Sequence, residues 1–193
     1  RPRLEQLHDA GRMLSLDVAV ERLARAVRGG EAIMVHGDYD VDGICSTTLM
    51  TRALRAFGGT VVPFIPRRIE DGYDLTDAGV DAAIRAGAKV VVTCDCGTSA
   101  RVPIQRLCTA GIDVIVSDHH LPGGALPECL AVLNPKRPGC EYPDKDLAAV
   151  GVAFKLALAL ARELGASENI VYHQLDLVAL ATIADIAPLR GEN

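Results

Sequence analysis

Acidic residues and histidines gather in short segments of this sequence, each of which directly follows an apolar run. These segments are HGDYDVDG at 36 to 43, CDCG at 94 to 97 and SDHH at 117 to 120. Carboxylate oxygens alone suit Mg²⁺ or Ca²⁺, whereas a mixture of carboxylate and imidazole favours Mn²⁺ and other first-row ions. The sequence therefore predicts metal binding, with Mn²⁺ favoured over Mg²⁺, by side chains drawn from Asp38, Asp40, Asp42, Asp95, Asp118, His119 and His120.

The number of ligand atoms in this set is more than one octahedral ion can use. This surplus points to two ions roughly 3.5 to 4 Å apart that share a carboxylate and a water. Such sites usually hydrolyse phosphoesters, with the attacking water activated by the ions, so no protein nucleophile is required.

The elements that must bring these side chains together are β-strands. Runs rich in β-branched residues occur at 32 to 35, 60 to 65, 88 to 93 and 112 to 116, with a shorter one at 130 to 133. Helical periodicity separates them at 44 to 57, 76 to 87 and 100 to 110. This alternation predicts an α/β fold with a parallel five-stranded sheet and helices on both faces. The carboxyl ends of parallel strands meet at one edge, where ligands bind, so the polar segments should converge.

The chain is expected to form one catalytic domain over residues 1 to 193. An amphipathic helix from about Leu16 to Arg28 lies in an N-terminal helical segment, 1 to 30, which precedes the α/β core at 31 to 145. A helical C-terminal segment, 146 to 193, should hold two apolar helices at about 147 to 164 and 168 to 184.

Composition is compatible with such an enzyme. With 193 residues, 49% of them hydrophobic, the chain can bury a sizeable core, and no apolar run is long enough for a membrane span. The net charge of -5 argues weakly against a nucleic-acid partner. Much of that charge, however, belongs to the aspartates of the predicted metal site. No export signal is seen, so a cytoplasmic location and six free cysteine thiols are expected.

Other interpretations apply to single residues. An isolated Asp after a strand is more often a helix N-cap than a ligand. An EF-hand does not fit residues 38 to 49, because Leu49 stands where its last ligand, a glutamate, should be. His36 and His119 would also fit core histidines that bond to backbone, and His120 a contact outside the ligand shell or to phosphate. The CxC pair of Cys94 and Cys96 indicates packing rather than a zinc site.

Four segments in order resemble the motifs of the DHH phosphoesterase superfamily: DYDVDG, the Asp95 segment, the DHH at 118 to 120 and TIADIAPL at 182 to 189. Within that superfamily, RIEDGYDL (68 to 75), SDHHLPG (117 to 123), NP (134 to 135) and AAVGVAFKLALAL (148 to 160) resemble the RecJ-type exonucleases. The resemblance extends from about Ala32 to Leu189.

The resemblance implies roles for individual residues. His36 and Asp40 would bind the first ion and Asp42 the second, with Asp95 bridging both. His119 and Asp185 would complete the set of ligands of the second ion. The catalytic set would include Asp38 and His120 besides Asp95 and His119, with Asp118 orienting an imidazole. Arg68, in preference to its neighbour Arg67, would contact a DNA phosphate together with His120.

The resemblance also implies a function. RecJ-type enzymes hydrolyse single-stranded DNA from the five-prime end during DNA repair and recombination. They carry further substrate-binding and OB-fold domains that this sequence lacks, so we expect the chain to bind Mn²⁺ but to degrade DNA poorly. A monomer is expected, with single-strand-binding proteins or helicases as partners of the full-length enzyme.

Three alternatives stay open at this point. A DHH phosphatase or phosphodiesterase acting on small nucleotides or oligonucleotides would share the metal motifs. A non-catalytic replication module would have lost them, whereas here every metal position is filled. A receiver-like or flavodoxin-like domain would not explain two adjacent histidines after a strand.

Overall fold

The computed structural model describes residues 3–193, and its centre is a parallel sheet. The strands are β1 (Ala32–Gly37), β2 (Thr60–Phe64), β3 (Val90–Cys94), β4 (Asp113–Ser117) and β5 (Ala131–Leu133). All four pairings are parallel, in the order β2-β1-β3-β4-β5. The predicted five-stranded α/β fold is confirmed, and the observed strands lie within two residues of the predicted runs at either end.

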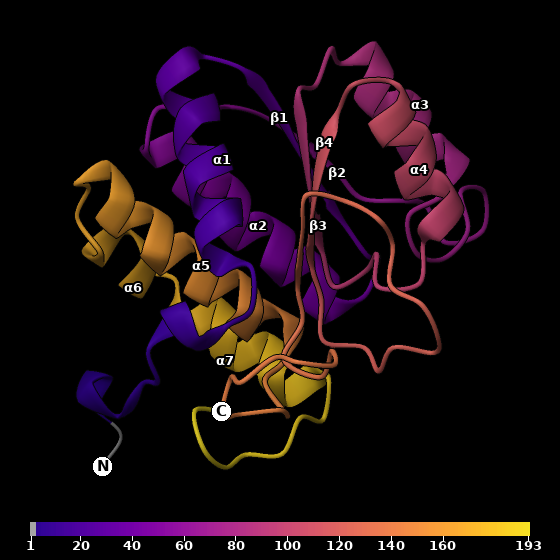
Figure 1. The fold of residues 1–193 in the computed structure, drawn as a ribbon. Coiled ribbons are helices and arrows are strands. Elements are labelled where there is room, and N and C mark those ends of the chain that lie inside the picture. The colour runs from indigo at the N-terminus through magenta and orange to yellow at the C-terminus, as the bar shows by residue number, and fades with distance from the viewer. Residues whose placement is uncertain (1–2) are drawn as a thin grey trace.

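Helices cover both faces of this sheet (Figure 1). One face carries α1 (Leu16–Gly29), α2 (Val41–Ala56) and α5 (Ala149–Leu164), and the other carries α3 (Asp77–Arg85) and α4 (Arg101–Thr109). Each face has its own apolar core, because the side chains of successive strand residues point alternately to one face of the sheet and to the other. Two short 3₁₀ helices, Leu4–Gln6 and Ala10–Arg12, precede α1.

The second apolar helix of the C-terminal segment is broken, contrary to the continuous helix expected at 168 to 184. The structure has α6 (Asn169–Tyr172) and α7 (Leu175–Ala184), with Gln174 departing from helical backbone at φ -109° and ψ 15°. The side-chain amide of Gln174 donates to the carbonyl of Ile170 at 3.3 Å. Residues of α7 are apolar on all sides, so no change of periodicity marks the break in the sequence.

The topology brings five chain segments to one end of the sheet. The loops after β1, β3 and β4 leave the sheet at its carboxyl edge, as expected for parallel strands. The helix α5 begins and α7 ends near the same edge, since α5 and α7 both pack on α2, whose first turn follows β1. This arrangement places the polar segments of the sequence around one point.

Within residues 3–193, no helix is both long enough and apolar enough to cross a membrane. All six cysteines are free thiols, as expected from their scattered positions.

Candidate metal centre

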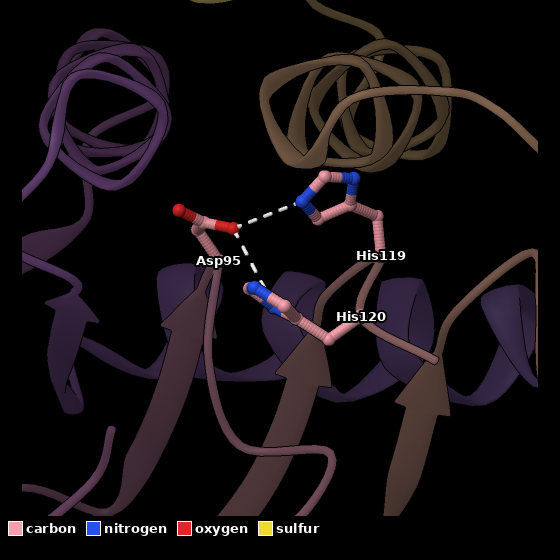
Figure 2. A group of neighbouring side chains, drawn as sticks. All are labelled: Asp95, His119 and His120. Carbon is pink, nitrogen blue, oxygen red and sulfur yellow. Dashed lines mark ion pairs between the residues drawn. The ribbon is translucent and has the colours of Figure 1, made fainter. Parts of the chain in front are cut away.

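Asp95 lies at the middle of the carboxyl edge, directly after the central strand β3. Its backbone is left-handed, with φ 66°, and its amide donates to the carbonyl of Ser117 at 3.0 Å. Figure 2 shows its carboxylate facing two imidazoles from the loop after β4. Asp95 Oδ1 lies 3.3 Å from His119 Nε2 and 3.8 Å from His120 Nδ1. These three residues form the first of three groups whose potential ligand atoms lie within 4.8 Å of one another.

A second group joins residues from three distant segments. Asp42 comes from the first turn of α2, His119 from the loop after β4, and Asp185 from the C-cap of α7. His119 Nε2 lies 3.9 Å from Asp42 Oδ2 and 3.7 Å from Asp185 Oδ2. The structure therefore places Asp185 at the site to which only the family resemblance had assigned it.

A third group consists of Asp38, Asp40 and Asp95. Asp40 is also the N-cap of α2, where its Oδ1 accepts the amide of Gly43 at 2.9 Å, so the N-cap interpretation holds for this residue as well. Asp38 Oδ1 and Asp95 Oδ1 are buried and accept no hydrogen bond. Buried carboxylate oxygens without donors are costly unless a cation approaches them.

Asp42 is held by the N-terminus of α5. Its two oxygens accept the amides of Ala149 and Val150, each at 2.8 Å, and Ser46 Oγ donates to Oδ1 at 3.2 Å. The exposed N–H groups at a helix N-terminus carry partial positive charge, which stabilises a nearby carboxylate. This contact was missed by the sequence analysis. The available signal was Ala148, the N-cap of α5, which has no side chain able to cap the helix itself.

Asp118 orients the loop that carries both histidines. Its oxygens accept the backbone amides of Thr98, His119 and His120, and Oδ1 lies 2.8 Å from His120 Nδ1. Burial alone would raise the pKa of Asp118, yet the contacts with His120 and Thr98 hold it below its ordinary value. The hydrogen bond to Asp118 in turn raises the pKa of His120. This geometry is the one that an orienting role for Asp118 requires.

Ionisation of the other buried carboxyl groups is opposed by their surroundings. Burial, and then the charges of Asp42 and Asp40, raise the pKa of Asp95 to about 10. Burial likewise raises the pKa of Asp38 and of Asp42. Carboxylates converge in this way where protons or cations sit among them. The donor set of carboxylate and imidazole, with donorless oxygens at its centre, fits divalent metal ions.

His36 lies outside the three groups. It is fully buried, its Nδ1 faces Cys96 Sγ at 3.6 Å, and its ring stacks on Phe64 with centroids 5.1 Å apart. Its Nε2 faces Gly79 of α3, where a Cβ atom would lie only 2.5 Å away. Burial lowers the pKa of His36 to about 4, so the ring is neutral. His36 belongs to none of the three groups, and its assignment to the first ion stays a prediction.

Arg68 stands beside the cluster on an aromatic surface. Its guanidinium carbon lies 5.2 Å from the centre of the Tyr39 ring, and the Tyr39 and Tyr73 rings are 6.1 Å apart, edge to face. Tyr73 Oη lies 3.3 Å from His120 Nε2. Arg67, by contrast, is engaged by Asp71 at 3.2 Å and by Glu70 at 2.9 Å. The two tyrosines were not singled out from the sequence, although both flank its acidic segments.

Known proteins resemble this chain over most of its length. The family described as "DHH family, N-terminal domain" matches residues 32–182. The single-stranded-DNA-specific exonuclease RecJ of Salmonella typhimurium is 46% identical over 189 residues, which covers 92% of this chain and 33% of that protein. The RecJ of Bacillus subtilis is 40% identical over 186 residues, covering 96% of this chain and 23% of that protein.

The fold is also that of a solved relative. A crystal structure of exonuclease RecJ bound to manganese aligns with a TM-score of 0.87 and 38% identity, over 99% of this chain and 47% of that one. The chain thus spans 33% and 23% of the lengths of the two curated relatives, a third or less.

Proposed function

The chain belongs to the DHH family, and from that membership we propose that it is the metal-binding part of a single-stranded-DNA exonuclease that hydrolyses phosphodiesters with two divalent ions. The observation that carries the proposal is the meeting of Asp42, Asp95, His119 and Asp185 at one point, although they come from four segments of the chain.

Two of the three groups correspond to two ion positions, and the third links them through Asp95 and His119. One ion would be held by Asp42, His119 and Asp185, and the other by Asp38, Asp40 and Asp95. Asp95 lies within reach of His119 as well, at 3.3 Å, which suits a bridging carboxylate. Mn²⁺ is favoured over Mg²⁺ by the imidazole ligand. When bound, such ions would lower the pKa of a coordinated water, so that hydroxide is available near neutral pH to attack phosphorus, and they would neutralise the charge that develops on the phosphoryl group.

Residues of the chain itself would orient this chemistry. The N-terminus of α5 fixes both oxygens of Asp42, and Asp118 fixes the ring of His120. His120 is 46% exposed at its side chain, so it can reach a phosphate that approaches the ions. Arg68 would contact a second phosphate, since a guanidinium fork matches phosphate geometry.

Single-stranded DNA as the substrate is proposed from the relatives named single-stranded-DNA-specific exonuclease RecJ. Tyr39 and Tyr73 offer ring faces beside the ion positions, and base stacking on aromatic rings is tolerant of sequence. Five-prime to three-prime polarity, a role in DNA repair and recombination, and single-strand-binding or helicase partners belong to this same proposal. So do a monomeric state and a cytoplasmic location.

The metal-binding step can be tested by titrating the chain with Mn²⁺ in a calorimeter. We expect two sites in the wild type and a loss of at least one in Asp95→Ala. Asp17→Asn is the matched control, because Asp17 is an exposed aspartate on α1. A wild-type chain that binds no Mn²⁺ would support the non-catalytic alternative and overturn the proposal.

The substrate can be tested with two probes. The p-nitrophenyl ester of thymidine 5′-monophosphate reports phosphodiester hydrolysis without a need to grip DNA, and a length series of labelled oligonucleotides reports substrate size. Preference for single strands over duplex, rising with length, supports the exonuclease. Efficient cleavage of dinucleotides with no cleavage of longer strands would instead establish the small-nucleotide phosphodiesterase.

A further inference from the structure

Lys155 is a buried cation in the middle of α5. Its side chain is 3% exposed, and its ammonium lies 2.6 Å from Glu192 Oε1 and 2.9 Å from the carbonyl of His8. It also lies 5.9 Å from the centre of the Tyr142 ring. A lysine in such surroundings needs a partner, because an unpaired buried charge is very costly. Glu192 is that partner, and it comes from the segment that follows α7.

The carboxylate of Glu192 accepts hydrogen bonds from several segments of the chain. Its side chain is 2% exposed, and besides Lys155 it accepts the amide of His8 and the hydroxyl of Tyr142. The amide of Glu192 donates to Asp144 Oδ2 at 2.9 Å. The segment after α7, which is the yellow loop that turns back in Figure 1, is thus tied to α5, to the N-terminal segment and to the loop before α5.

The other end of this segment is Asp185, and the turn that carries it is strained. Ile186 has φ 56°, in the left-handed region that favours glycine, and it is 87% exposed. The amide of Ala187 donates to the carbonyl of Thr182 at 3.1 Å, and that of Ile186 to Ile183 at 3.2 Å. These are the hydrogen bonds of a Schellman motif, which usually has glycine where Ile186 stands. A β-branched residue in this conformation persists only where the surrounding structure holds it.

We propose that the buried Lys155–Glu192 pair is a positioning device that holds the strained turn and so aims the carboxylate of Asp185 at the ion shared with Asp42 and His119. Helix α5 then serves the same ion position twice. Its first N–H groups hold Asp42, and Lys155, further along the helix, holds Glu192. This inference rests on the proposed function, because it presupposes that Asp185 binds a metal.

A purely stabilising role makes a different prediction. Buried ion pairs often contribute little net stability, and their best-attested use is to specify one arrangement of the chain. A stabilising pair would affect unfolding alone, whereas a positioning pair would affect the metal affinity of the folded protein. Arg22 provides the comparison, since its buried side chain pairs with Glu31 and Asp113 at the amino ends of the strands, far from the site.

The test is a double-mutant cycle between Glu192 and Asp185, read by calorimetric Mn²⁺ titration and by urea unfolding. We expect Glu192→Gln to weaken Mn²⁺ binding at one site by roughly tenfold, in the range seen when groups that orient metal ligands are removed. In the Asp185→Asn background, Glu192→Gln should have no further effect on Mn²⁺ affinity. Arg22→Met should lower the urea midpoint and leave Mn²⁺ affinity unchanged.

If Glu192→Gln does not fold, the double variant Lys155→Met/Glu192→Met takes its place, because it leaves no unpaired buried charge. It too should bind Mn²⁺ more weakly at one site. Wild-type affinity in a folded Glu192 variant, or equal losses with and without Asp185, would overturn the positioning role. A wild-type chain that binds no Mn²⁺ would instead overturn the proposed function itself.

Discussion

The carboxylate of Asp42 accepts the amide of Ala149 at 2.8 Å, although the two residues are 107 positions apart in the sequence. One side chain therefore has two tasks, as a candidate metal ligand and as the cap of α5. The two tasks place different demands on the residue. Ligation needs a charged oxygen, whereas capping needs only an acceptor of suitable length.

Substitutions at Asp42 should separate these tasks. Asp42→Asn retains one acceptor for the α5 amides but places an NH₂ donor against the other amide and loses the charge, so we expect Mn²⁺ binding at that site to be lost with a moderate loss of stability. Asp42→Ala removes the acceptor as well and should lower the free energy of unfolding by a further 0.5 to 2 kcal/mol or so. Urea denaturation with EDTA present measures the difference. Equal stability of the two variants would show that the α5 cap contributes nothing.

Asp95 should destabilise the metal-free protein as pH rises. Its folded pKa is raised to about 10 by burial and by the neighbouring carboxylates, above the ordinary value of 3.8. Between pH 3.8 and about pH 10, Asp95 is ionised in the unfolded chain but stays protonated in the folded chain. The free energy of unfolding therefore falls as the pH rises through this range. We expect Asp95→Asn in EDTA to be more stable than wild type at pH 8, by roughly 1 to 3 kcal/mol, and nearly equal at pH 4.

With Mn²⁺ present, we expect the wild type to be more stable than Asp95→Asn at pH 8. The ion stabilises the ionised carboxylate of the wild type and not the amide of the variant. Urea midpoints with and without Mn²⁺ at both pH values provide the check. A variant less stable than wild type at pH 8 without metal would contradict the expectation that the pKa of Asp95 is raised in the folded protein.

The convergence of the metal-binding residues was predictable because it follows from one rule of topology. Val/Ile runs at regular spacing imply a parallel sheet, and the carboxyl ends of its strands meet at one edge, which places Asp95, His119 and the aspartates after β1 together. Asp185 does not follow a strand. Only the family resemblance assigned it to the site, since it ends an apolar helix whose break from α6 carries no periodic signal.

The contacts that orient the site could not be predicted from the sequence. Ala149 donates through its backbone, so its residue type carries no information about Asp42. Lys155 lies in an apolar helix, but its partner Glu192 is 37 positions away in a segment without regular structure. Long-range pairs of this kind depend on how loops close over the sheet, which local propensity and periodicity do not determine.

Ile186→Gly should stabilise the protein. The left-handed backbone at this position costs a residue other than glycine about 1 to 2 kcal/mol, and the exposed Ile side chain loses little on removal. We therefore expect the free energy of unfolding to rise by about 1 kcal/mol in urea. Ile183→Gly is the matched control, because Ile183 is exposed but helical, and there glycine should be destabilising. A loss of stability in Ile186→Gly would show that the turn is unstrained.

His36 is the residue for which the family resemblance and the geometry disagree, and a substitution can decide between them. The resemblance assigns it to the first ion, whereas the structure buries it between Phe64, Cys96 and Gly79. From the geometry, we expect His36→Phe to change Mn²⁺ affinity less than about threefold. Gly79→Ala should be the more damaging change, costing about 1 to 3 kcal/mol of stability, because its Cβ would lie 2.5 Å from the imidazole.

Calorimetric Mn²⁺ titration and urea unfolding of both variants, beside Asp40→Asn, give the comparison. Asp40 belongs to a group of ligand atoms that excludes His36, so Asp40→Asn should abolish one Mn²⁺ site. If His36→Phe abolished a site as completely as Asp40→Asn does, the imidazole would have to turn away from α3 and toward Asp40 when metal binds. Gly79 would then be the residue that gives the ring room to turn, and the family assignment of His36 would hold.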